Sequence, residues 1–305
     1  MKVLITGDEG FIGKYLSQYY VSRNAEVYGW DIKGVHSSNS IYQPADMIKQ
    51  EDAEKVLSEI QPDYIYHCAG IADVRRSVEN PLLDLESNYI TTHNLLFAMK
   101  KLHMKSCRFL LFSSAAVYGN PMSLPISEES AVHPLSPYAL HKLAAEEVCR
   151  FVHANDELDI KIIRIFSAYG PGLKKQIFWD MYNKIMQTGK LELWGSGSES
   201  RDYIYIDDLI QAVTLITHQS PRDTLVYNVA NGVETTIRQA AESFANHIGA
   251  DRSVIRFNGI VREGDPVNWK ADISKLMKLG YSRSVFFDEG IRKYVEWVKE
   301  MNTNG

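Results

Sequence analysis

The sequence predicts an α/β protein with a doubly wound parallel β-sheet that helices cover on both faces. Two observations support this fold class. Short apolar runs alternate with longer amphipathic segments through the first half of the chain, and a glycine-rich segment directly follows the first apolar run. Because each predicted strand is followed by a helical crossover, successive strands are expected to run parallel.

Each predicted element is assigned from its pattern of apolar residues. Strands are expected where short runs of apolar and aromatic residues stand between polar segments, at residues 2–6, 26–30, 64–67, 108–113 and 161–165. Helices are expected where apolar residues recur at i, i+3 and i+4, at residues 11–22, 51–59, 82–102 and 137–153.

The pattern loosens after residue 165, where glycine-containing loop signals occur at residues 170–172 and 195–197. For a chain of 305 residues we therefore expect two unequal parts. The larger part is residues 1–165, to which segments around 204–230 return, and the smaller C-terminal part is mainly residues 166–305. A cleft between the two parts is the expected ligand site.

The composition is that of an ordinary globular protein, with 45% hydrophobic residues and a net charge of −5. There is no overall basic field, so no nucleic-acid partner is expected. No apolar run reaches the roughly 18 residues of a membrane helix, and the first residues lack the apolar region of a secretory signal. A cytoplasmic protein without membrane contact is the expectation. Cys68, Cys107 and Cys149 have no CxxC spacing, so they predict buried, reduced thiols and no metal site.

The glycine-rich segment has the features of a dinucleotide-binding turn. Gly7, Gly10 and Gly13 follow the first strand and open the first helix, so backbone N–H groups and a helix N-terminus can meet a pyrophosphate. Asp31 closes the second strand 18 residues after Gly13, close to the spacing of a carboxylate that binds the adenosine ribose. This favours a Rossmann-type fold and NAD over NADP, although Lys33 leaves NADP open. The structural alternatives are a tight turn and an ordinary surface acid.

A candidate reaction centre lies in the loop and helix that follow the fourth strand of this pattern. Tyr138 and Lys142 stand four residues apart in a predicted helix and therefore share one face. The lysine ammonium is expected to lower the pKa of the Tyr138 phenol by about 1–3 units, which would make it a general base. Ser114 follows the strand at 108–113 and is expected to orient the reacting oxygen. The alternatives are a chance spacing and a serine that caps the strand.

The chain as a whole resembles the extended branch of the short-chain dehydrogenase/reductase superfamily, in its nucleotide-sugar epimerase/dehydratase group. The resemblance runs nearly from end to end. Besides the glycine turn and the Tyr138-x-x-x-Lys142 pair, it rests on residues 67–70, Asn88 at the start of a long helix, 164–172, 201–208, 227–230, 262–265, 271–272 and 290–298.

The resemblance implies a set of ligand contacts. Those to NAD are Gly7, Gly10, Phe11, Ile12 and Gly13 at the pyrophosphate, Asp31 and Ile32 at the ribose, Asp46 and Met47 at the adenine, Ala69 and Gly70 beneath the cofactor, Asn88 and Phe166 near the nicotinamide, and also Tyr138 and Lys142. Those to a nucleoside-diphosphate sugar are Ser114, Ser167, Arg201 and Arg262. Guanidinium groups suit the diphosphate, and solvated surface charge is the alternative for the two arginines.

The resemblance implies an NAD-dependent nucleotide-sugar 4-epimerase that oxidises sugar carbon 4 transiently, with Tyr138 as base. Members that act as 4,6-dehydratases carry an acidic pair where this chain has Ala115 and Ala116, so dehydration is less expected. An NAD(P)H-dependent reductase of a nucleotide-linked 4-keto-6-deoxy sugar remains the alternative. A non-catalytic NAD-binding sensor is less expected because Ser114, Tyr138 and Lys142 are all present. Ser167 replaces a common asparagine, so the sugar is not assigned.

A homodimer is the expected assembly. The helices at 82–102 and 137–153 are amphipathic and resemble the pair that forms a four-helix interface in this group. The alternative is that their apolar stripes face only the sheet.

Overall fold

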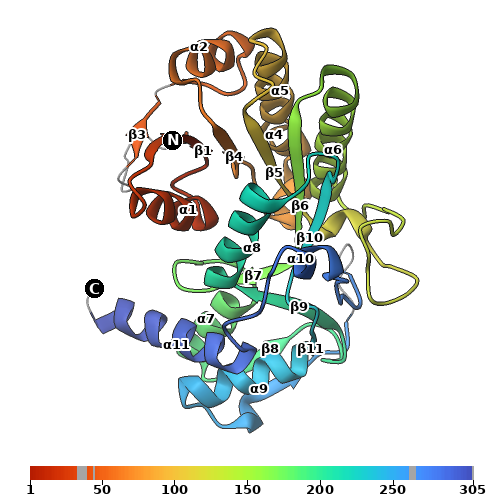
Figure 1. Cartoon of the computed structure of the whole chain (residues 1–305). Coiled ribbons are helices and arrows are strands. Elements are labelled where there is room, and N and C mark those ends of the chain that lie inside the picture. The colour runs from red at the N-terminus through yellow and green to blue at the C-terminus, as the bar shows by residue number, and fades with distance from the viewer. Residues whose placement is uncertain (33–39, 44, 261–265, 304–305) are drawn as a thin grey trace.

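The computed structural model describes residues 1–32, 40–43, 45–260 and 266–303 and centres on a seven-stranded parallel sheet (Figure 1). Across the sheet the strands are β10 (Val226–Val229), β6 (Asp159–Ile165), β5 (Arg108–Ser114), β4 (Tyr64–His67), β1 (Lys2–Thr6), β2 (Glu26–Trp30) and β3 (Ile41–Tyr42). Because the order of the strands reverses between β1 and β4, the sheet is doubly wound. The predicted fold class is confirmed.

Helices cover both faces of this sheet. On one face α1 (Phe11–Val21) packs against α8 (Ile206–Gln219). On the other, α2 (Gln50–Ile60), α5 (Thr91–Lys101) and α6 (Pro137–Asp156) pack in a row. Side chains of β1 alternate between the two cores: Val3 and Ile5 pack in the first and Leu4 in the second.

The predicted helix at 82–102 is present but is not uniform. It consists of α4 (Pro81–Leu85), a π-helical turn (Glu86–Ile90) and α5 without a break. Asn80 caps it by accepting a hydrogen bond from the Leu83 N–H at 3.2 Å, and Pro81 occupies the first turn. Asn88 therefore lies inside the helix, in the π turn, and the expectation that it opens the helix is wrong.

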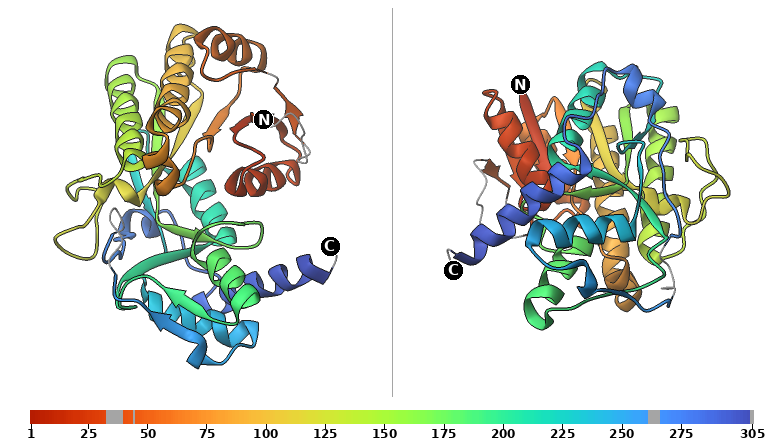
Figure 2. Two further views of the ribbon diagram at one scale, coloured as in Figure 1. Left: turned by 180° about the vertical axis from the view of Figure 1, so that it is seen from behind. Right: turned by 90° about the horizontal axis from the view of Figure 1, so that it is seen from below.

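The C-terminal part contains more regular structure than the sequence pattern indicated. It has a three-stranded sheet of β11 (Glu234–Thr236), β9 (Ser200–Tyr205) and β7 (Ser167–Tyr169), and a two-stranded sheet of β12 (Ile255–Phe257) and β8 (Leu191–Leu193). Its helices are α7 (Gln176–Thr188), α9 (Ile237–Ile248), α10 (Ser274–Lys278) and α11 (Phe287–Thr303), and Figure 2 shows α11 projecting from this part. Most of these strands have three residues, too few for a period-2 pattern to be visible. The division of the chain at residue 165 stays a prediction.

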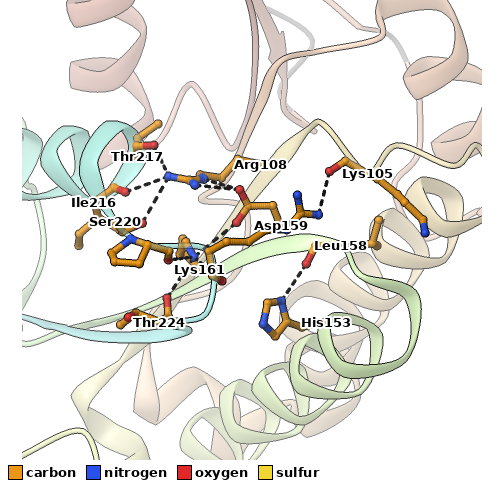
Figure 3. Close-up of polar contacts among 12 residues, drawn as sticks. Lys105, Arg108, His153, Leu158, Asp159, Lys161, Ile216, Thr217, Ser220 and Thr224 are labelled. Atoms are coloured by element: carbon orange, nitrogen blue, oxygen red, sulfur yellow. Dashed lines mark hydrogen bonds and ion pairs between the residues drawn. The ribbon is translucent and has the colours of Figure 1, made fainter.

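A buried polar cluster ties β10 and α8 to the amino-terminal edge of β5 and β6 (Figure 3). Arg108 pairs with Asp159 at 2.8 Å and donates a hydrogen bond of 2.6 Å to the Thr217 carbonyl in the last turn of α8. The Lys161 ammonium donates to three carbonyl oxygens between residues 221 and 224, at 2.7, 3.0 and 3.1 Å. The segment that leads into β10 is thus fixed to the sheet through these paired charges.

The cysteines agree with the sequence expectation of free thiols: Cys107 and Cys149 are buried and Cys68 is partly buried. Within the described ranges, no helix has the length and apolar character needed to cross a membrane.

Candidate active site

The glycine turn lies between β1 and α1 and is packed too tightly for larger residues. A Cβ atom on Gly7, where φ is +68°, would stand 2.8 Å from the Ala69 backbone nitrogen at the end of β4. A Cβ on Gly13 would stand 2.2 Å from the Gly7 carbonyl oxygen. Gly10 is the N-cap of α1, and no side chain in the described part of the protein caps this helix. The turn therefore presents α1 backbone N–H groups at the carboxyl edge of the sheet, where a pyrophosphate fits.

Asp31 lies at the carboxyl end of β2 beside this turn. Its carboxylate accepts a hydrogen bond of 3.3 Å from the Glu9 backbone N–H, so the turn and the predicted ribose-binding carboxylate are adjacent. The two acidic residues of the turn are themselves engaged: Asp8 accepts a 2.7 Å hydrogen bond from Ser40, and Glu9 pairs with Lys14 at 3.1 Å.

The other residues proposed for the adenosine half differ in exposure. Ile32 and Asp46 are exposed, whereas Met47 is buried in the core between the sheet and α2. Phe11 and Ile12 are partly buried in the first turns of α1. Arg262 lies outside the described residues.

Replacing Gly13 by Ala is expected to abolish detectable NAD binding, because the new methyl group would overlap the Gly7 carbonyl and displace the turn. Isothermal titration with NAD measures the loss. Gly189→Ala is the matched control, since a Cβ there meets nothing within 4 Å. This variant is expected to lose only about 1 kcal/mol of stability, because alanine disfavours the positive φ of residue 189. Equal NAD affinity in Gly13→Ala and the wild type would refute this role of the turn.

The structure brings Ser114 and Tyr138 together at the carboxyl edge of the sheet. Ser114 is the last residue of β5, and its hydroxyl accepts a hydrogen bond of 3.1 Å from the Ala116 N–H. The Ser114 hydroxyl is also near enough to the Tyr138 phenol to lower the pKa of that phenol. α6 starts one residue before Tyr138 because Ser136 caps it, accepting from the Ala139 N–H at 3.2 Å. Ser114 is thus both a cap, as the structural alternative held, and a neighbour of Tyr138.

Lys142 lies one helical turn beyond Tyr138, and both side chains are buried. Its ammonium donates a hydrogen bond of 2.9 Å to the Phe112 carbonyl of β5. This contact anchors the side chain against the sheet, next to the strand that ends at Ser114.

The expected lowering of the Tyr138 pKa by Lys142 is wrong for the protein alone. The Tyr138 pKa is raised to about 12, mainly by burial and to a smaller extent by the Asp84 carboxylate, and the Ser114 hydroxyl offsets only part of this rise. Burial likewise lowers the Lys142 pKa to about 8, against the opposing effect of Asp84. Loss of hydration penalises the charged form of both groups and is the dominant cause of both shifts.

The Gly70 backbone and the Asn88 side chain lie next to the Lys142 ammonium. A Cβ on Gly70 would stand 2.3 Å from Asn88 Oδ1 and 3.4 Å from Lys142 Nζ, so all three meet at one point. The Asn88 amide nitrogen donates to the Ile71 carbonyl at 3.1 Å and to Asp84 at 3.0 Å, but its Oδ1 is buried with no hydrogen-bond partner among the described residues. Such an unsatisfied acceptor indicates a place where a polar ligand binds. The arrangement therefore fits a dinucleotide that passes over Gly70 toward Lys142.

A small cavity of about 50 Å³ adjoins Ser114 and Tyr138. It is lined by Val74, Ala116, Gly119, Leu135, Ser136, Ala139, Pro266 and Trp269. Sequence patterns did not single out Leu135 or Trp269, because each comes from a loop without periodicity. Arg201 lies against this wall, with its guanidinium carbon 5.6 Å from the centre of the Trp269 ring, and Phe166 packs edge-on to the same ring.

Ser167 opens β7 and is partly buried. It directly follows Phe166, whose backbone N–H donates to the Val229 carbonyl at 3.1 Å. The structure thus brings Phe166 and Arg201 to one wall of the cavity, with Ser167 next to Phe166 in sequence.

The family described as "NAD dependent epimerase/dehydratase family" has a sequence profile that matches residues 3–230. The chain belongs to this family. The predicted family, an NAD-dependent enzyme of the nucleotide-sugar epimerase type, is thereby confirmed.

Similar proteins of known structure cover the whole chain. The UDP-glucose 4-epimerase of Thermotoga maritima, solved with UDP-glucose, is 25% identical with a TM-score of 0.90 and covers 99% of this chain and 100% of its own. The UDP-glucuronic acid 4-epimerase of Bacillus cereus, solved with UDP-glucuronic acid and NAD, is 29% identical with a TM-score of 0.88 over the same shares. By sequence, the UDP-glucose 4-epimerase of Mycolicibacterium smegmatis is 29% identical over 98% of this chain and 99% of its own.

Proposed function

We propose that this protein is a nucleotide-sugar 4-epimerase that uses NAD. The observation that carries the proposal is the placement of Ser114, Tyr138 and Lys142 at the carboxyl edge of the sheet, around the point where Asn88 Oδ1 lacks a partner. Full-length similarity to UDP-sugar 4-epimerases supports the same reaction.

The cofactor would be held by the glycine turn at its pyrophosphate and by Asp31 at its adenosine ribose. A carboxylate at Asp31 repels a ribose 2′-phosphate, which favours NAD over NADP. When bound, NAD supplies the hydride acceptor for sugar carbon 4 and returns the same hydride. Ala69, Gly70 and Asn88, on the side of the site that faces Lys142, would lie along the nicotinamide half of NAD.

Tyr138, as phenolate, would accept the proton of the sugar 4-hydroxyl at its oxygen, and Ser114 would hold that hydroxyl in line by a second hydrogen bond. Because the Tyr138 pKa is about 12 in the protein, the transfer needs positive charge nearby. The Lys142 ammonium provides it from one turn along α6. After the 4-keto sugar has turned over in the site, Tyr138 would return the proton to the oxygen at carbon 4.

The substrate diphosphate would be bound by Arg201, with Arg262 as a second guanidinium. Ala115 is buried in the core and Ala116 lines the cavity, and neither carries an acid or a base. This argues against elimination of water across carbons 5 and 6, which needs both.

An assay with purified protein and no added reduced cofactor tests the reaction. UDP-glucose, UDP-glucuronate and UDP-N-acetylglucosamine are each incubated, and the products are resolved by nuclear magnetic resonance. We expect one of them to reach equilibrium with its 4-epimer without net change in NADH. Stoichiometric consumption of added NADH with a nucleotide-linked 4-keto-6-deoxy sugar, and no epimerisation, would instead identify the reductase.

We also propose a homodimer formed by the helices that run from Pro81 to Lys101 and along α6. Ala145 and Cys149 of α6 face the core. Leu140 and Phe151 lie about three turns apart on a different face of α6, and each is 53% exposed. Apolar residues on a second face suit a contact with another copy.

Phe151→Glu is expected to convert the dimer to monomer at micromolar concentration, because the contact would then bury an unpaired carboxylate. Light scattering coupled to gel filtration gives the mass. Met186→Glu, at an exposed residue of α7, is the control and should remain dimeric. A monomeric wild-type protein under the same conditions would remove the proposal.

A further inference from the structure

Asp84 is a buried carboxylate beside the candidate active site that takes no part in the proposed reaction. It lies in α4, is 1% exposed, and is held from two sides. Its Oδ2 lies 2.7 Å from His141 Nδ1, and its Oδ1 accepts a hydrogen bond of 3.0 Å from the Asn88 amide. A buried carboxylate is costly unless such partners compensate it, so this pair of contacts indicates a built arrangement.

The arrangement adjoins Lys142 in two ways. His141 directly precedes Lys142 in α6, and Asn88 presents its unpartnered Oδ1 toward the point where Lys142 Nζ also lies. Asp84 is thus one hydrogen bond from the side chain that faces the ammonium. Its negative charge stabilises the charged form of Lys142 against the effect of burial.

We propose that Asp84 is a positioning residue whose negative charge keeps Lys142 protonated in the buried site. His141 holds Asp84 in place through the 2.7 Å contact of its Nδ1. The inference rests on the proposed function, in which Lys142 acts as an ammonium beside Tyr138.

Other charged groups near this arrangement do not substitute for Asp84. Glu146 on α6 also acts on Lys142, but more weakly than Asp84. Burial raises the pKa of the Cys68 thiol after β4, so this group stays uncharged. The neighbouring α3 (Val74–Glu79) carries Arg75, Arg76 and Glu79, which are exposed. Glu86, in the π turn after α4, is partly buried.

Asp84→Asn tests the proposal because it keeps the shape of the side chain and removes only its charge. The full-length protein is labelled with ¹³C-lysine, and nuclear magnetic resonance follows the Lys142 Cε signal as the pH is changed. The signal is assigned by its absence in Lys142→Met. The wild type is expected to titrate near pH 8, since the Lys142 pKa is about 8. In Asp84→Asn the midpoint should fall by about one unit, a tenfold change in proton affinity.

Two variants of His141 provide the control and the independent test. His141→Gln is neutral and can still donate to Asp84, so its midpoint should equal that of the wild type. His141→Lys places a permanent cation on Asp84 and should lower the midpoint as Asp84→Asn does, even if the latter folds poorly by circular dichroism. An unchanged midpoint in His141→Lys, or in folded Asp84→Asn, would overturn the proposal.

The pH dependence of kcat/KM gives a second readout. Loss of the Lys142 proton lowers the rate, so the alkaline limb is expected to move to lower pH in Asp84→Asn by the same amount as the resonance. A merely structural role would lower the rate at every pH without moving the limb, which would contradict the proposal. If the proposed function fails, the wild type shows no turnover at any pH, whereas the resonance still reports on Asp84.

Discussion

Replacing Tyr138 by Phe is expected to lower kcat by about 10²–10⁴-fold while NAD binding is retained. The variant removes only the phenol oxygen, which is the atom that exchanges the proton of the sugar hydroxyl. Burial of Tyr138 leaves little room for water to replace it. Steady-state epimerisation measures kcat, and mass spectrometry of co-purifying nucleotides reports the cofactor.

Tyr89→Phe is the matched control for this experiment. Tyr89 lies in the π turn next to Asn88, is only partly buried, and has no place in the proposed proton transfer. Its kcat is expected to stay within twofold of the wild type. A Tyr138→Phe variant with wild-type kcat would mean that another group moves the proton.

Replacing Glu146 by Ala is expected to destabilise the protein by about 3–5 kcal/mol, the largest effect on stability that we predict. Glu146 and Arg164 are buried, and the guanidinium donates to the carboxylate from Nε at 3.0 and 3.2 Å and from Nη2 at 2.6 Å. The Ser113 hydroxyl also donates to this carboxylate, at 2.6 Å. Removal of the carboxylate would leave the Arg164 guanidinium buried without its counter-charge and detach α6 from β5 and β6.

Chemical denaturation monitored by circular dichroism measures this loss of unfolding free energy. Glu147→Ala is the control, because its side chain is 63% exposed and its pair with Arg150 lies at the surface; it should change stability by less than about 0.5 kcal/mol. The double variant Glu146→Leu/Arg164→Met should recover part of the loss, since no unpaired charge remains. Equal effects of Glu146→Ala and Glu147→Ala would contradict the structural role of the pair.

The sequence predicted the elements that combine sufficient length with a clear period. The strands at 2–6, 26–30 and 64–67 have the predicted bounds. The glycine turn lies between β1 and α1, as predicted. The pattern could not locate three-residue strands such as β7, because such a segment has no period.

The remainder of the site depends on contacts between distant segments. Asp84 and His141 are 57 residues apart, and no local signal connects them. The position of Asn88 within a π turn likewise follows from packing rather than helix propensity. The pKa of Tyr138 was misjudged because the pairing with Lys142 was visible in the sequence, whereas the depth of burial was not.

The most direct test of reversible oxidation at carbon 4 follows an isotope rather than a rate. A UDP-sugar that the enzyme accepts is prepared with deuterium at carbon 4 and incubated in ordinary water, and the 4-epimer is analysed by mass spectrometry and nuclear magnetic resonance. If the hydride leaves carbon 4 and returns to its other face within one site, the epimer retains the deuterium at carbon 4. Loss of the label to solvent would contradict the account, since it would place a proton exchange where we infer a hydride transfer.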